Sequence, residues 1–138
     1  MRSQSRTNAL LIELLIVILF FMLASTILVR VFGEAYRQSE TAGVSVEALA
    51  GVQNLADRIY TAGEPEELLF AEGFTEEAAE DGETGTAYVK DYERYSVRVS
   101  LSAEPAGDGI LRKGKVEAYY RGALLISLPC TGYREAGQ

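Results

Sequence analysis

The chain contains no histidine, and its 138 residues include a single cysteine, Cys130. Without histidine the chain lacks the commonest general base of enzymes and the commonest metal ligand. One cysteine cannot form a disulfide within the chain, and with no CxxC or Cys/His cluster the sequence argues against a structural zinc site. Because no Gly-x-Ser-x-Gly motif is present either, we expect no enzyme activity, no metal and no cofactor.

Positive charge is also scarce in this chain. Only 13 lysines and arginines stand against 20 aspartates and glutamates, which gives a formal net charge of -7 at neutral pH. An acidic surface does not attract phosphate groups. We therefore expect no nucleic-acid partner.

The most informative feature that is present is an apolar run over residues 9–29, in which Glu13 alone interrupts the first half. The run provides the roughly 20 residues that a membrane-spanning helix needs. A carboxylate inside a membrane is costly, so Glu13 is by default a functional candidate. Arg2 and Arg6 precede the run, and the positive-inside tendency places them in the cytoplasm and the rest of the chain outside.

Two general interpretations of this run are available. A secretory signal peptide has a shorter apolar region of about 7–15 residues and a small-residue cleavage site, whereas residues 29–31 read Val-Arg-Val. A plain single-pass anchor fits the length, and Glu13 would then snorkel to the membrane interface.

A third interpretation is a resemblance to a known family. Residues 8–17 read NALLIELLIV, which resembles the N-terminal segment of type IV pilins and type II secretion pseudopilins. Members of that family have a short basic leader, a cleavage site and then an apolar helix with glutamate as the fifth mature residue. If Ala9 is the first mature residue, Glu13 is the fifth. Asn8 stands where family members usually carry glycine.

The resemblance implies specific roles. A prepilin peptidase would recognise the leader with Arg2 and Arg6, cleave between Asn8 and Ala9, and leave Ala9 as the site of N-methylation. Glu13 would pair with the Ala9 amine of a neighbouring subunit and set the axial register of a filament. The implied partners are other pilin-like subunits, the prepilin peptidase, an inner-membrane assembly platform and the lipid bilayer.

The sequence therefore predicts a minor pilin-like (pseudopilin) subunit of a type II secretion, type IV pilus or competence-type filament. Its place would be the cytoplasmic membrane, crossed once, with the N-terminus cytoplasmic and the C-terminal domain extracytoplasmic. The alternative is an uncleaved single-pass membrane protein with a small extracytoplasmic binding domain.

Helical periodicity continues beyond the apolar run, and no proline occurs between Ala9 and Ala62 to interrupt a helix. Apolar or small residues recur at steps of three and four, as on one face of an amphipathic helix. A break near Gly33 or Gly43 is an open alternative. The predicted stripe comprises Phe32, Tyr36, Ser39, Ala42, Val46, Leu49, Val52, Ala56 and Ile59.

The remainder of the chain alternates with the period of strands. We expect a short helix over residues 66–71 and then strands over residues 87–92, 95–102, 111–120 and 124–130. Short links favour an antiparallel meander. Arg121-Gly122 indicates a tight turn, Pro129 confines its strand to an edge or to the strand's end, and Cys130 is expected to be a small buried hydrophobe.

Between the short helix and the strands, residues 72–85 form an acidic, glycine-containing segment. It lacks the Asp-x-Asp-x-Asp-Gly pattern of a calcium loop, so we expect a solvated acidic loop. Five tyrosines, Tyr88, Tyr92, Tyr95, Tyr119 and Tyr120, are expected to pack in the core and across strands, with a contact surface as the alternative.

Taken together, the predicted fold is α+β: a long N-terminal helix, transmembrane in its first half, packed by a small antiparallel sheet of about four strands. We divide the chain into a basic leader (1–8), a transmembrane helix (9–32), an amphipathic helix continuation (33–62) and a small outward-facing α+β domain (63–138).

Overall fold

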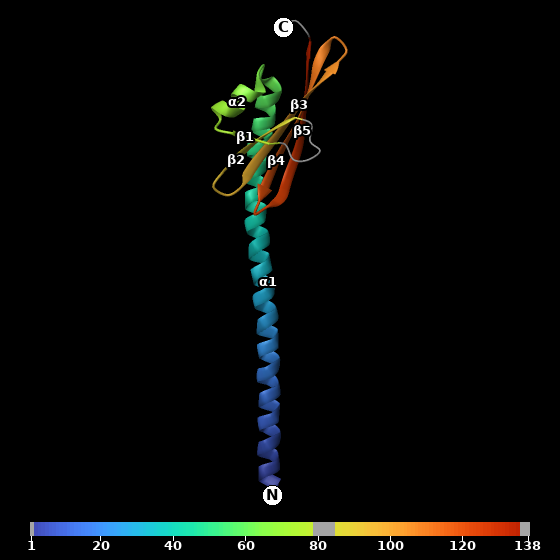
Figure 1. Ribbon diagram of the computed structural model, residues 1–138. Helices are drawn as coiled ribbons and strands as arrows, with labels where there is room; N and C mark the ends of the chain where they lie inside the picture. Colours follow the sequence, from blue (N-terminus) through green and yellow to red (C-terminus); the bar gives the residue numbers. More distant parts are fainter. Residues whose placement is uncertain (1, 79–84, 136–138) are drawn as a thin grey trace. The chain divides into compact units, whose positions relative to one another are not determined.

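The computed structural model describes residues 2–78 and 85–135, which divide between two compact units, Met1–Glu40 and Thr41–Gln138 (Figure 1). The predicted α+β fold is confirmed, and the described residues form five strands rather than about four. The elements are α1 (Arg2–Thr61), α2 (Pro65–Ala71), β1 (Thr75–Glu77), β2 (Thr86–Asp91), β3 (Ser96–Ala106), β4 (Gly109–Tyr120) and β5 (Ala123–Glu135).

Helix α1 begins at Arg2, inside the predicted leader, and passes through Gly33 and Gly43 without a break. The open alternative of a break at either glycine is therefore wrong. The hydroxyl group of Thr26 is satisfied within the helix: Thr26 Oγ1 donates to the Met22 carbonyl oxygen at 2.9 Å. Such a bond to the preceding turn hides a polar group that could not find water in a bilayer.

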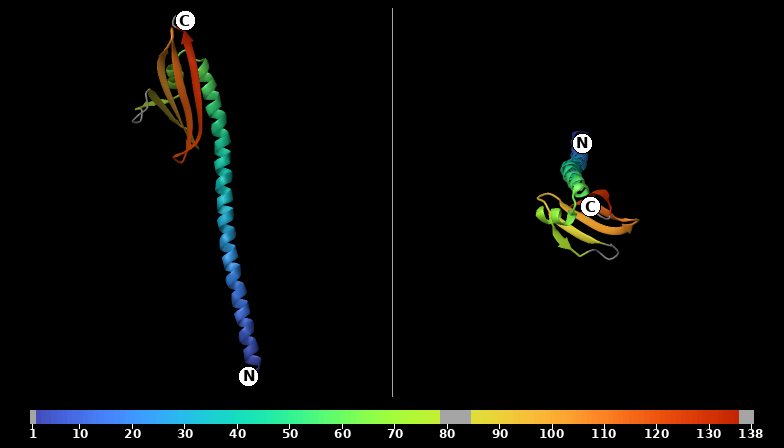
Figure 2. Two further views of the ribbon diagram at one scale, coloured as in Figure 1. Left: turned by 90° about the vertical axis from the view of Figure 1, so that its right-hand side faces the viewer. Right: turned by 90° about the horizontal axis from the view of Figure 1, so that it is seen from above.

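The core of the second unit lies between one face of α1 and one face of the sheet. Figure 2 shows the sheet on a single side of the last part of α1. The helix contributes Val44, Ala48, Val52, Leu55 and Ile59, all of them buried. Val97 and Val99 of β3 and Val116 and Ala118 of β4 meet them from the sheet, where Val99 stands opposite Val116 and Val97 opposite Ala118.

This buried face differs from the predicted stripe, which was wrong in register. Only Val52 and Ile59 belong to both sets; Val46 is 70% exposed and Leu49 is 38% exposed. The helix is rich in valine and alanine, so apolar residues at steps of three and four occur on two neighbouring faces. The sheet covers the face that carries Val44 and Ala48, whose small side chains allow close approach.

Gly51 helps to explain why the sheet covers this face of α1. A Cβ at this position would lie 2.7 Å from the hydroxyl oxygen of Tyr95, a buried side chain that stacks on Tyr92 with ring centroids 5.0 Å apart. Glycine in a helix interior costs roughly 1 kcal/mol relative to alanine. Here that cost leaves space for a tyrosine to pack against the helix.

The sheet is an antiparallel meander in the order β1-β2-β3-β4-β5, as the short links predict. The β4–β5 turn at Arg121 and Gly122 is confirmed, with φ values of 51° and 79°, the left-handed pair of a two-residue hairpin. Pro129 lies within β5, which is an edge strand, so that assignment is confirmed as well.

Two strand assignments needed correction. β1 lies within the segment that we expected to be an acidic loop. No strand was expected there because glutamate has low intrinsic strand propensity. Phe74, 3% exposed, anchors this strand immediately before its first residue. The central part of the predicted acidic loop, with Glu80, Asp81 and Glu83, lies outside the described residues.

The second correction concerns strand length. β3 and β4 continue to a hairpin at Gly107 and Asp108, and β5 continues to Glu135, although we expected a loop near Pro105. Proline is tolerated there because β2 pairs with β3 only as far as Leu101. Beyond Leu101, the described part of the sheet consists of β3, β4 and β5.

The buried face of α1 generates a prediction with a matched control. Leu55→Ala removes a buried side chain and should lower the free energy of unfolding of the second unit by about 2–5 kcal/mol. Leu49→Ala, on the neighbouring exposed face, should cost less than about 1 kcal/mol. Urea unfolding of the full-length protein in detergent, followed by tyrosine circular dichroism, measures both. An equal loss for the two variants would contradict the observed register.

Candidate functional site

The residues that the sequence singled out lie on the first turns of α1, in the first unit. Arg6, Ala9 and Glu13 are spaced by three and four residues, so the helix brings them to one face. Asn8 lies one position before Ala9 and therefore points away from that face. The side chain of Arg2 lies outside the described part of the structure.

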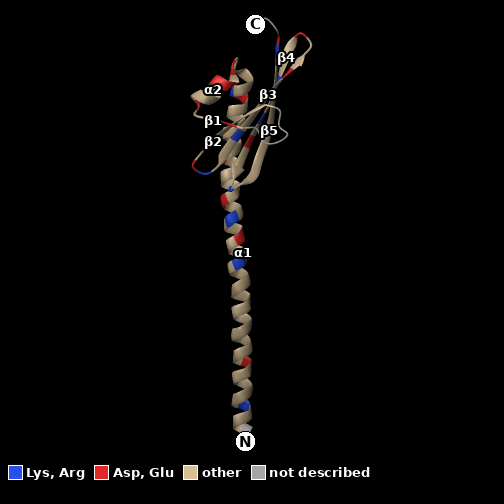
Figure 3. Cartoon of the chain, viewed as in Figure 1, with Lys and Arg blue, Asp and Glu red and all other residues tan. Residues whose placement is uncertain are grey.

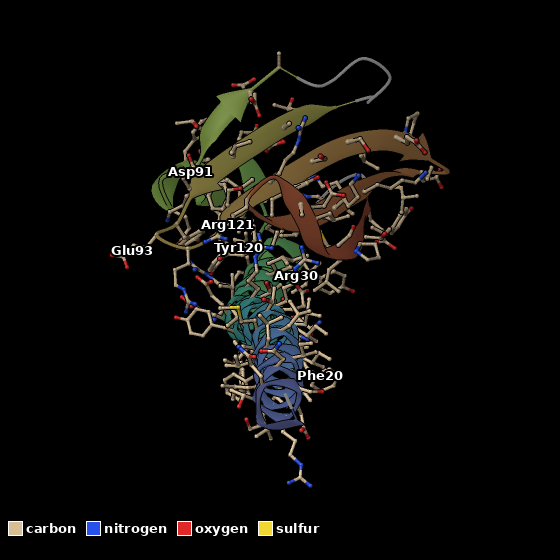
Figure 4. The ribbon with its side chains drawn as sticks, turned by 90° about the horizontal axis from the view of Figure 1, so that it is seen from below. Phe20, Arg30, Asp91, Glu93, Tyr120 and Arg121 are labelled. Carbon is tan, nitrogen blue, oxygen red and sulfur yellow. The ribbon has the colours of Figure 1, made fainter. Side chains whose placement is uncertain are left out.

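Glu13 is exposed and lies among apolar side chains. Its neighbours Ile12 and Leu14 are 61% and 57% exposed, and the pattern continues along the helix to Phe32. Figure 4 shows Phe20 and Arg30 extending outward from the helix. Within residues 2–78 and 85–135, the Glu13 carboxylate makes no hydrogen bond or ion pair.

Charged residues are unevenly distributed along the first unit. No charged residue occurs between Glu13 and Arg30, and Figure 3 shows this part of α1 without charge colours. In the described part of the chain, α1 is the one helix long and apolar enough to cross a membrane. A carboxylate on such a surface needs a positive partner or access to water, because an unpaired buried ion costs several kcal/mol.

The second unit has exposed apolar side chains on α1 as well. Val46 and Leu49 lie on the side of the helix that the sheet does not cover, and they are 70% and 38% exposed. Their spacing places them on one stripe, next to the buried face. Both residues belong to the apolar stripe that the sequence predicted.

The tyrosines are divided between the two uses that we considered. Tyr88 and Tyr95 are buried, as expected for packing residues, and burial raises the pKa of both phenols. Burial and the Glu117 carboxylate, which accepts a hydrogen bond from Tyr119 at 3.1 Å, raise the pKa of Tyr119. Tyr92 is 40% exposed, yet it stacks on Tyr95.

Sequence reasoning missed one cluster of polar side chains. Arg112 on β4 and Arg134 on β5 both donate to the carbonyl oxygen of Gly63, at 2.7 and 3.2 Å. Gly63 follows the end of α1, so residues far apart in the sequence meet here. The available signal was the alternation of arginine with glycine in two neighbouring strands, at 112 and 114 and at 132 and 134.

Cys130 lies next to this cluster, on the sheet face that packs towards α1. It is half-buried, and burial raises the pKa of its thiol above the usual value. The cysteine thus packs against the core, as expected from its place in the strand pattern.

Comparison with known proteins gives no family assignment: no protein-family model matches the chain, and no curated protein or solved structure shows a significant match.

The raised pKa of Cys130 generates a prediction. Since the thiolate is the reactive form, iodoacetamide at pH 8 should modify the folded protein at least roughly tenfold more slowly than the urea-unfolded chain. The rate should rise as the pH increases towards the raised pKa. Intact mass against time measures the rate, with glutathione in the same urea solutions as the reference. Equal rates in the folded and unfolded chains would contradict the assigned burial.

Proposed function

We propose that this protein is a minor pilin-like (pseudopilin) subunit that assembles into a type II secretion, type IV pilus or competence-type filament. One observation carries the proposal: Glu13 presents a carboxylate on an exposed apolar helix surface, at the fifth position counted from Ala9. A long helix that continues into a small α+β unit is compatible with such a subunit.

Cleavage after Asn8 would give the carboxylate a suitable partner. It would leave Ala9 with a free amine, which is positively charged at neutral pH. Ala9 and Glu13 lie one turn apart on the same helix face, so two helices packed with a small axial offset can bring the amine of one next to the carboxylate of the other. The pair neutralises both ions away from water and fixes the offset between subunits.

The apolar surfaces of α1 support association of helices. The large apolar side chains from Leu10 to Phe32 are exposed in the first unit, and Val46 and Leu49 are exposed in the second. Lipid can cover the first of these sets. The stripe in the second unit would face water in a monomer, whereas neighbouring subunits in a filament would cover it.

The remaining roles follow from this assignment. Arg2 and Arg6 would hold the N-terminus in the cytoplasm, and the unit with the sheet would lie outside the membrane. A prepilin peptidase, a membrane assembly platform and other pilin-like subunits would be its partners.

A second candidate function is an uncleaved single-pass protein whose outer unit binds a ligand. The hollow beside Arg112 and Arg134 favours it, and so does Asn8, whose Cβ hinders the close backbone approach that glycine allows. Cleavage and assembly separate the two candidates.

Cleavage generates the first prediction of this proposal. When the protein is expressed with a prepilin peptidase, residues 1–8 should be lost, and the new N-terminus at Ala9 should carry a methyl group. Asn8→Gly should increase the cleaved fraction, because it removes the Cβ at the scissile bond. Intact mass of membrane-extracted protein, with and without the peptidase, measures both effects. A full-length mass for the parent protein and for the Asn8→Gly variant alike would favour the uncleaved anchor.

Assembly generates the second prediction. Glu13→Ala should still insert into the membrane but should enter filaments at least roughly tenfold less efficiently, because the neighbouring amine loses its counter-ion. Glu34→Ala removes an acid from the same helix outside the apolar run and is the matched control. Quantitative immunoblotting of sheared filaments and of membranes measures the two pools. Normal incorporation of Glu13→Ala would refute the register role.

A further inference from the structure

A large hollow opens in the second unit where the sheet continues beyond the end of α1. It encloses about 960 Å³ and is lined by the end of α1, the start of α2 and the paired ends of β3, β4 and β5. We call it the Gly63 hollow, after the residue at which Arg112 and Arg134 converge. Its volume is within the range of small-molecule sites, about 300–1,000 Å³.

Strand register explains why the face is hollowed here. On the sheet face that packs towards α1, Leu101 stands opposite Gly114 and Gly114 opposite Cys130. In the next row, Gly132 stands opposite Arg112. Glycine at these two positions removes the side chains that would fill the space.

The two glycines are not interchangeable with larger residues. A Cβ at Gly114 would lie 2.6 Å from the sulfur of Cys130, so glycine is needed for Cys130 to occupy the floor. At Gly132 a Cβ would reach the ring of Tyr60 at 4.0 Å, an ordinary contact that would narrow the hollow. Leu101, Cys130 and Tyr60 therefore give the hollow an apolar floor and one aromatic wall.

The polar side of the Gly63 hollow is built from two guanidinium groups. Arg112 Nη1 and Arg134 Nη1 donate to the same carbonyl oxygen, which draws two positive charges together. The Arg112 guanidinium carries five N–H donors in a planar fork, more than one carbonyl oxygen can accept. Such a fork matches a carboxylate in a bidentate arrangement.

Other charged residues also line the hollow, and most of them are acidic. Lys113 is held by Glu104 at 2.7 Å, which leaves that pair neutral. Glu66 and Glu135 are the other lining acids. Together with Glu104 they equal in number the three basic lining residues, so the hollow has no net formal charge and recognition of an anion rests on the geometry of the arginine fork.

We propose that the Gly63 hollow binds an organic monocarboxylate with an apolar body. The carboxylate lies on the fork of Arg112, with Arg134 beside it, and an aliphatic or aromatic body lies on Leu101, Cys130 and Tyr60. A free acid and the C-terminal carboxylate of an apolar peptide share this chemistry. The site does not require polymerisation, so it holds for a filament subunit and for a single-pass protein alike.

The position of Cys130 provides a direct test, because it is the single cysteine of the chain and lies in the floor. Full-length protein in nanodiscs is reacted with a maleimide in the presence of 4-phenylbutyrate or of its neutral amide. A parallel pair is the tripeptide acetyl-Ala-Leu-Leu with a free or an amidated C-terminus. At ten times the Kd, mass action leaves about one-tenth of the sites open, so labelling should slow about tenfold.

The expected result is that a free carboxylate slows labelling and that the matched amide does not. Protection by phenylbutyrate identifies a small free acid as the ligand type, and protection by the tripeptide acid alone identifies a peptide terminus. No protection by either acid up to about 10 mM, tenfold above a millimolar Kd, overturns the proposal. Equal protection by acids and amides overturns it as well.

Variants assign the effect to the arginines. Arg112→Gln should abolish protection, whereas Arg94→Gln, a matched loss of one exposed arginine that pairs with Glu47, should leave it unchanged. If Arg112→Gln lowers the melting temperature of the protein, Arg112→Lys serves instead. It keeps the charge but loses the fork, so the Kd should rise at least roughly tenfold. Full protection in the folded lysine variant would contradict carboxylate recognition by Arg112.

Discussion

The second unit depends on one contact, in which α1 lies against the face of the sheet through Val44, Ala48, Val52, Leu55 and Ile59. A unit of this size has a small core, and its stability is correspondingly marginal. An antiparallel sheet of this kind needs one covered face, and α1 supplies the cover. Small residues on the helix let the sheet approach closely, and Gly51 makes room for Tyr95. The close contact between sheet and helix thus depends on side-chain size as well as on hydrophobicity.

In the described residues of the first unit, no sheet covers the same helix. Apolar side chains are exposed there, and one carboxylate lies among them. An apolar surface alone would be satisfied by lipid. Glu13 adds a requirement that lipid tails cannot meet, because a carboxylate needs a positive charge, a hydrogen-bond donor or water. In a membrane, Glu13 would therefore need a polar partner or access to water, and under the proposed function that partner is the subunit amine created by cleavage before Ala9.

Sequence periodicity was sufficient for the element types and for the antiparallel order, because the strands alternate clearly and the hairpins carry turn residues such as Arg121-Gly122. It was insufficient for the buried face of α1. Val46 and Leu49 fit a helical stripe as well as Val44 and Ala48 do, and only the shape of the sheet decides between them. Nor could it predict β1, whose Thr-Glu-Glu sequence becomes a strand through pairing with β2.

For the candidate site residues, too, the sequence predicted local features but not contacts between distant residues. Motif spacing located Glu13, because the signal there is local. The meeting of Arg112, Arg134 and Gly63 depends on strand register and on where α1 ends, neither of which a local pattern contains. Two arginines at the C-terminal end of a helix also have a structural explanation, since that end of the helix dipole attracts cations. A point charge satisfies the dipole, whereas bidentate recognition of a carboxylate needs the planar fork, so arginine rather than lysine at position 112 favours a role in binding.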